Sequence, residues 1–265
     1  MRGRRHRQGR RQIVRLIEPA ELRSWIVHED EELLVINKPG SVVCHPSKQG
    51  PWSSLIGACR EYTGLATLHM PSRLDRETSG VVLFAKTHAL GSQLQRAIQA
   101  RRVRKRYLAI LHGRLAGSVL VDQPIGPRPG AVVVMEQTVR ADGAAARTEF
   151  RPLAATEHFT LAEVEPQTGR MHQIRVHARW LGHSIVGDKI YGPDPALFLE
   201  FIEQGFTPAL ARELLLERQA LHAASIRYDV DPPAAFEAPL APDLVNFCQA
   251  HGINQGSSSP DGPCK

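Results

Sequence analysis

Residues 72–87 read SRLDRETSGVVLFAKT and place a charged loop directly in front of an apolar strand. The run GVVLFA contains no polar side chain, which is typical of a strand that is buried on both faces of a sheet. In the loop, Asp75 stands between Arg73 and Arg76. Charged loops are usually only solvated, so a function for Asp75 needs support from the rest of the chain.

Strand and helix patterns extend outward from this stretch in both directions, and strands are in the majority. We expect two short strands within 31–47, joined at Pro39-Gly40, and further strands at 80–87, 104–115, 131–139, 146–156, 158–166 and 220–230. We expect helices at 53–64, 88–102, 171–181, 195–219 with a break near Gly205, and 241–252. Because the strands do not alternate strictly with helices, these patterns predict one α+β domain on a largely antiparallel mixed sheet flanked by helices, from residue 20 to 250.

The composition indicates a polyanionic partner. Lys and Arg number 33 against 27 Asp and Glu, which gives a formal charge of +6 and a pI near 9.4. Residues 1–15 contain seven arginines and no acid. We interpret residues 1–19 as a basic flexible arm, which contacts phosphates or is only solvated, with organellar targeting as a third alternative. Residues 251–265 read as a disordered tail.

Several classes of protein find no support in the sequence. No GxxxxGK[ST], GxGxxG or GxSxG pattern occurs, so phosphate cradles, dinucleotide sites and serine hydrolase elbows are not indicated. His172 and His177 are five residues apart with no carboxylate between them, which does not fit a helical zinc pair. The four cysteines form no CxxC and read as reduced, mostly structural thiols. No apolar run approaches the ~18 residues of a membrane span.

Three segments instead combine arginines with a few groups suited to catalysis: SRLDRETSG (72–80), KRYLAILHG (105–113) and QTGRMHQIRVH (167–177). Together they resemble the RluA-type pseudouridine synthases, with their RLDxxTSG loop, K/R-x-Y-L-A strand and TGRxHQIRVH segment. The stretches LLVINKPGSVVCHPS (33–47), LGHSIVGDKIYG (181–192) and RQALHA (218–223) resemble further elements of the family in the same order. The resemblance covers about residues 30 to 245. One departure is Ser72, where many members have His.

The resemblance implies an RNA isomerase that breaks the N-glycosidic bond of uridine, rotates the uracil and rejoins it through C5. It implies that Asp75 is the catalytic carboxylate and that Tyr107 lies against the base. It also implies that Arg175 pairs with Asp75, because a nearby guanidinium favours the ionised form of a carboxyl group. Arg73 corresponds to an arginine associated with extruding the target nucleotide, and its alternative role is a phosphate contact.

A second group of residues is assigned to substrate binding, each with an alternative. Lys38 lines the pocket or binds phosphate, and Arg76 binds phosphate or is solvated. Arg170 and His172 contact substrate or form polar packing. Asp188 is interpreted as structural.

The reaction is redox-neutral, so we expect no cofactor and no metal ion. The expected partner is RNA, either ribosomal or transfer RNA, and we expect a cytoplasmic monomer without membrane association. Two other readings stay open: a catalytically silent RNA-binding protein on the same fold, and a carboxylate glycosidase acting on nucleosides, which would require a second acid.

Overall fold

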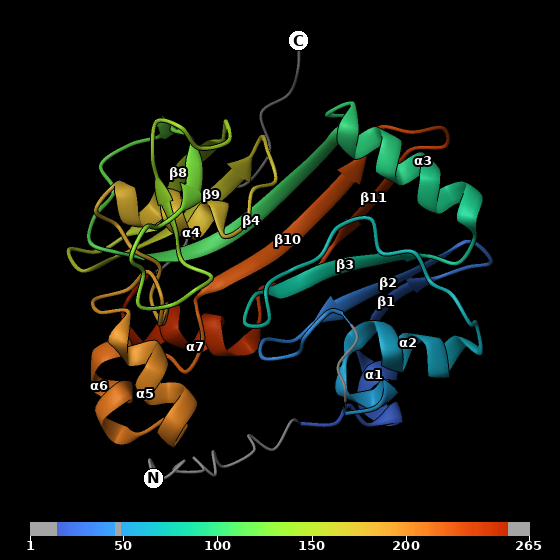
Figure 1. Ribbon diagram of the computed structural model, residues 1–265, viewed down its shortest axis with the longest axis horizontal. Coiled ribbons are helices and arrows are strands. Elements are labelled where there is room, and N and C mark those ends of the chain that lie inside the picture. The colour runs from blue at the N-terminus through green and yellow to red at the C-terminus, as the bar shows by residue number, and fades with distance from the viewer. Residues whose placement is uncertain (1–14, 46–48, 254–265) are drawn as a thin grey trace, which may run out of the picture.

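A computed structural model describes residues 15–45 and 49–253, and within them nine strands form one mixed sheet (Figure 1). The strand order is β1-β2-β3-β10-β4-β9-β8-β5, with β11 added beside β10. The strands are β1 (Ile26–Glu29), β2 (Leu33–Lys38), β3 (Ser79–Ala85), β4 (Val103–His112), β5 (Val119–Asp122), β8 (Arg147–Ala155), β9 (Phe159–Pro166), β10 (Leu221–Tyr228) and β11 (Ala234–Glu237). Among the pairings described for this sheet only β3 and β10 run parallel. The α+β class with a largely antiparallel sheet is therefore confirmed.

Helices cover both faces of the sheet, and a small ribbon stands apart from it. The helical segments are α1 (Pro19–Ser24), η1 (Pro51–Ser53), α2 (Leu55–Thr63), α3 (His88–Gln99), α4 (Gln173–Trp180), α5 (Ala196–Gln204), α6 (Pro208–Leu214) and α7 (Pro242–Ala250). The ribbon consists of β6 (Ile125–Pro127) and β7 (Gln137–Val139). None of the helices in the described residues has the length and apolar character needed to cross a membrane.

Strand β3 occupies the centre of the sheet because both of its faces are apolar. Every residue from Ser79 to Ala85 is buried. Val82 and Phe84 pack with α1 and α2 on one face, and Val81 and Leu83 pack with α3 on the other. This two-sided burial explains the uninterrupted apolar run in the sequence.

The helix expected at 53–64 is confirmed as α2, and the residues at its ends explain its limits. The side chain of Ser54 accepts a hydrogen bond from the Gly57 amide at the start of the helix, and Gly64 closes it in the left-handed region with φ +68°. The break near Gly205 is also confirmed, since it separates α5 from α6.

Three expectations about local structure were wrong. Residues 41–45 form no strand, because the carbonyls of Val43 and Cys44 accept hydrogen bonds from the first turn of α2 instead of from a neighbouring strand. Of the expected strand 131–139, only Gln137–Val139 forms a β-strand. The helix expected at 171–181 begins at residue 173.

The late start of α4 follows from the backbone of His172, which is left-handed with φ +56°. Met171 consequently lies outside the helix and is 44% exposed. Ile174 and Ala178, inside the helix, are buried in the core.

Two residues just outside the expected limits of 20 and 250 pack against the core. Ile17 and Ile253 are both buried, and the Ile17 amide donates to the Trp52 carbonyl. Most of the predicted arm and tail, residues 1–14 and 254–265, lies outside the described residues.

Candidate active site

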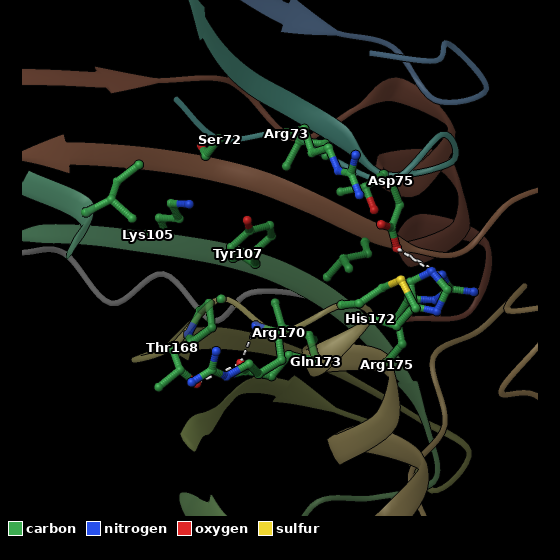
Figure 2. A pocket seen from close by; sticks show the side chains of 18 of the residues that line it. Ser72, Arg73, Asp75, Lys105, Tyr107, Thr168, Arg170, His172, Gln173 and Arg175 are labelled. Atoms are coloured by element: carbon green, nitrogen blue, oxygen red, sulfur yellow. Dashed lines mark hydrogen bonds and ion pairs between the residues drawn. The ribbon is translucent and has the colours of Figure 1, made fainter. Parts of the chain in front are cut away.

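A pocket of about 350 Å³ opens where two loops meet above β4 (Figure 2). One wall is the loop of residues 71–78, called here the Asp75 loop, which leads into β3. The opposite wall is the connection between β9 and α4, residues 166–172. Lys105 and Tyr107 of β4 line the floor. The sheet register places Tyr107 between Ala223 of β10 and Val164 of β9, at the centre of the sheet.

Asp75 and Arg175 meet in this pocket, as the resemblance implied. The Nη1 atom of Arg175 donates to Oδ2 of Asp75 at 2.9 Å across 100 residues of sequence. Arg175 is buried, whereas the Asp75 side chain is 35% exposed. The carboxylate is therefore held from below and open toward the pocket.

Arg175 is itself fixed by Asp188, which the sequence identified only as structural. Nε and Nη2 of Arg175 donate to Oδ2 and Oδ1 of Asp188 at 2.7 and 2.8 Å, a bidentate pairing that lysine cannot reproduce. The Asp188 carboxylate is fully buried and also accepts hydrogen bonds from the amides of Ile190 and Tyr191, both at 3.0 Å. The guanidinium thus has one orientation, and Nη1 remains for Asp75.

The electrostatics of the cluster keep Asp75 ionised. Burial acts to raise the pKa of Asp75, but the Arg175 guanidinium, the nearby His172 and the hydrogen bond from Arg175 outweigh it, so the pKa is lowered. The pKa of Asp188 is lowered in the same way, with burial opposed by Arg175. Two carboxylates therefore share one buried cation and both remain charged at neutral pH.

His172 lies beside Asp75 as a neutral group. Its Nε2 is 3.8 Å from Oδ2 of Asp75, and burial together with Arg175 lowers its pKa to about 4. The hydroxyl of Tyr191 accepts the Gln137 amide at 2.8 Å and lies 2.8 Å from Nδ1 of His172. The distance from Nε2 to the carboxylate is longer than a hydrogen bond. His172 therefore lies in the wall beside Asp75 as a neutral polar group.

Tyr107 contributes a neutral phenol to the floor. Burial, with smaller contributions from Asp75 and Tyr228, raises its pKa above the ordinary value. The phenol is therefore protonated at neutral pH and offers an aromatic face between Asp75 and Lys105.

Lys38, predicted as a substrate contact, supports the Asp75 loop instead. It is fully buried, and its Nζ donates to the carbonyls of Pro39, Val42 and Arg76, each at 3.0 Å. All three donors are occupied by backbone, so none is left for a substrate. Burial lowers the pKa of Lys38 to about 8.

Further contacts fix the same loop. Glu77 accepts a hydrogen bond from Lys189 at 2.8 Å, and the side chain of Gln219 donates to Thr78 Oγ1 at 2.7 Å. Gly80 has φ +109°, and a Cβ there would lie 2.2 Å from the Ala223 carbonyl oxygen. Only glycine fits this position.

The predicted arginines are distributed unevenly. Arg73 is exposed and lines the Asp75 pocket, while Arg76 is exposed but lines neighbouring cavities. Arg170 lines the Asp75 pocket and donates from Nε to the Ala145 carbonyl at 3.0 Å. Lys105 was not identified as a site residue. The available signal was its place in the K-x-Y-L-A motif, two residues before Tyr107.

Comparisons with known proteins point to one family. The sequence profile described as RNA pseudouridylate synthase matches residues 32–180. The uncharacterized RNA pseudouridine synthase YjbO of Bacillus subtilis (strain 168) is 42% identical over 182 residues, covering 67% of this chain and 63% of that protein. Ribosomal large subunit pseudouridine synthase D of Vibrio vulnificus (strain CMCP6) is 34% identical over 245 residues, covering 86% of this chain and 73% of that protein. This chain thus spans only part of the length of either relative.

Two solved human structures share the fold. RNA pseudouridylate synthase domain containing 4 superimposes with a TM-score of 0.67 and 25% identity, over 87% of this chain and 94% of that chain. RNA pseudouridylate synthase domain containing 1 superimposes with a TM-score of 0.64 and 25% identity, over 90% of this chain and 96% of that chain. The fold is that of the pseudouridine synthase class. The chain belongs to the RNA pseudouridine synthase family.

Proposed function

We propose that this chain converts uridine to pseudouridine in RNA and that Asp75 is its catalytic carboxylate. The observation that carries the proposal is the arrangement around Asp75. It is an ionised carboxylate, open to a pocket, held by a guanidinium that a second, buried carboxylate orients. A group in this state is suited to support a sugar or base while the glycosidic bond is open.

The isomerisation balances without an oxidant or reductant. The bond between C1′ and N1 breaks, the uracil rotates, and a bond forms between C1′ and C5. N1 gains a proton and C5 loses one. Because the phenol of Tyr107 is neutral and therefore a weak base, Asp75 is the stronger acceptor for the C5 proton among these two groups.

The walls of the pocket suit an extruded uracil. A stacked and paired uridine hides its glycosidic bond, so the nucleotide must leave the helix before Asp75 reaches it. Tyr107 provides a face on which the ring rests, and the exposed Arg73 at the rim occupies the space that the base vacates or contacts its phosphate. Arg170 and His172 lie within reach of the same ring from the opposite wall.

Among RNA substrates, the relatives favour ribosomal RNA. One relative, whose match covers 86% of this chain, is named ribosomal large subunit pseudouridine synthase D. We therefore propose large-subunit ribosomal RNA as the substrate, with transfer RNA as the alternative. We expect the protein to act in the cytoplasm, as a monomer, without metal or cofactor.

The test combines mapping in cells with a reaction in vitro. Pseudouridines in total RNA are compared with and without this gene, and we expect one or a few uridines of large-subunit ribosomal RNA to lose the modification. The purified chain then restores them on an unmodified transcript, while Asp75→Asn does not, although its RNA affinity stays within about tenfold.

A catalytically silent RNA-binding protein is the rival function. It predicts identical pseudouridine maps with and without the gene and no conversion of the transcript by wild-type protein. Conversion by Asp75→Asn would remove Asp75 from the mechanism and leave the enzyme class intact.

A further inference from the structure

Lys105 lies at the end of the catalytic pocket that is remote from Asp75. It is on β4, two residues before Tyr107, so both side chains emerge on the same face of the sheet. Figure 2 shows Asp75, Tyr107 and Lys105 in succession along the pocket. Ile98 of α3 and Pro166 of β9 also line it, and neither carries a charge.

Lys105 differs from the other lysines of the described residues in having no partner. Lys38 donates to three carbonyls, Lys86 binds Glu29 at 2.7 Å, and Lys189 binds Glu77 at 2.8 Å. For Lys105, within residues 15–45 and 49–253, there is neither a hydrogen bond nor an ion pair. A partly buried ammonium normally keeps a partner, because its desolvation is otherwise uncompensated.

The surroundings of Lys105 provide no anion to balance it. The sequence from Thr78 to Val121 contains no Asp or Glu. Of the charged groups that line the pocket, Asp75 is engaged by Arg175, and Arg73 and Arg170 are cations. Burial alone lowers the pKa of Lys105 to about 8, with no opposing carboxylate.

We propose that Lys105 binds a backbone phosphate of the RNA beside the target uridine, forming a phosphate subsite at this end of the pocket. The inference rests on the proposed function, since RNA is the polyanion that the pocket receives. Two residues along a strand span about 6.6 Å. With the uracil on Tyr107 and its ribose toward Asp75, it is the phosphate of a flanking nucleotide, and not that of the target uridine, that we place near Lys105. A phosphate supplies the missing anion, and Lys105 positions the substrate without touching the reacting atoms.

The first test is the salt dependence of RNA binding, measured in the Asp75→Asn background so that no turnover occurs. The probe is unmodified large-subunit ribosomal RNA transcribed in vitro. Lys105→Met should lower the slope of log affinity against log salt by about 0.7 to 0.9, the value for one lost phosphate contact, and Lys105→Arg should restore it. Lys86→Met is the matched control, because Lys86 pairs with Glu29 outside the pocket, and it should leave the slope unchanged.

The second test needs no substitution at Lys105. With lysine side chains labelled at Cε, the Lys105 signal of the Asp75→Asn protein should titrate near pH 8, and a saturating oligouridylate should move its pKa upward, because phosphate favours the charged ammonium. The Lys86 signal should not move.

Two results would overturn the proposal: a pKa of Lys105 that saturating RNA leaves unchanged, or a salt slope of RNA binding that Lys105→Met leaves unaltered. Both readouts are independent of isomerisation. A silent RNA-binding protein would fail to convert the transcript yet show the shift of Lys105, so failure of the proposed function is distinguishable from failure of this subsite.

Discussion

Removing the cation that faces Asp75 should shift the pH dependence of the reaction. Arg175→Met alone would leave Asp188 as a buried anion without a partner, which costs about 3–5 kcal/mol of folding free energy. The double variant Arg175→Met/Asp188→Asn removes both charges together. The Oδ1 atom of an asparagine can still accept the amides of Ile190 and Tyr191. The double variant therefore tests Asp75 with little disturbance of the fold.

The size of the effect follows from the hydrogen bond between Arg175 and Asp75. The hydrogen bond from Arg175 to Asp75 is 2.9 Å long and charge-assisted, a type that contributes about 1.5–3 kcal/mol. Because the Asp75 side chain is 35% exposed, solvent screening reduces this to about 1–2 kcal/mol. Losing this stabilisation of the charged form should raise the pKa of Asp75. Loss of the cation disfavours the carboxylate, so the activity should begin to fall at a higher pH.

The assay is kcat/KM for pseudouridine formation on unmodified large-subunit ribosomal RNA between pH 4 and 8, where the acidic limb reports the essential base of the free enzyme. Above the limb, the rate should drop by roughly 5- to 30-fold, the equivalent of 1–2 kcal/mol. Arg179→Met is the control: Arg179 lies one turn further along α4 and pairs with Glu136, which also keeps Arg128 as a partner. If the double variant shows an unmoved acidic limb while remaining folded, Arg175 is not the group that keeps Asp75 ionised.

Three further outcomes are expected. Lys38→Met should destabilise the fold by about 1–3 kcal/mol for each carbonyl left without a donor, measured by urea unfolding, and should leave the salt slope of RNA binding unchanged; a reduced slope would restore Lys38 as a substrate contact. Gly80→Ala should lose more than about 1–3 kcal/mol, because its Cβ would lie 2.2 Å from the Ala223 carbonyl, and near-normal thermal stability would contradict that geometry. The lowered pKa of Asp188 contributes stability above about pH 4, its unfolded value, and this contribution is lost as the pH falls through the folded pKa. The melting temperature should therefore change less between pH 2 and 7 for Arg175→Met/Asp188→Asn than for wild type. An equal fall of the melting temperature with acid in both proteins would contradict the assignment.

The local pattern of side chains in the sequence was sufficient to predict the central strand and the helix α2. The apolar run of β3 predicts a strand buried on both faces, and Ser54 and Gly64 mark the ends of α2. These features depend on neighbours within a few residues, where side-chain periodicity and backbone preference are decisive. The order of the motifs likewise sufficed to indicate the family, and through it Asp75 and Tyr107.

Only the tertiary structure determined how the charged groups pair. Asp75 and Arg175 are 100 residues apart, and Lys38 reaches the Arg76 carbonyl across 38. The sequence alone does not distinguish a lysine that holds three carbonyls from one that faces an open pocket, because both are cations on strands. Burial and distance decide between them, since a charge removed from water must find a partner in space and not in sequence. For the same reason the bidentate pairing of Arg175 with Asp188, and the unpaired state of Lys105 within the described residues, became visible only in the folded chain.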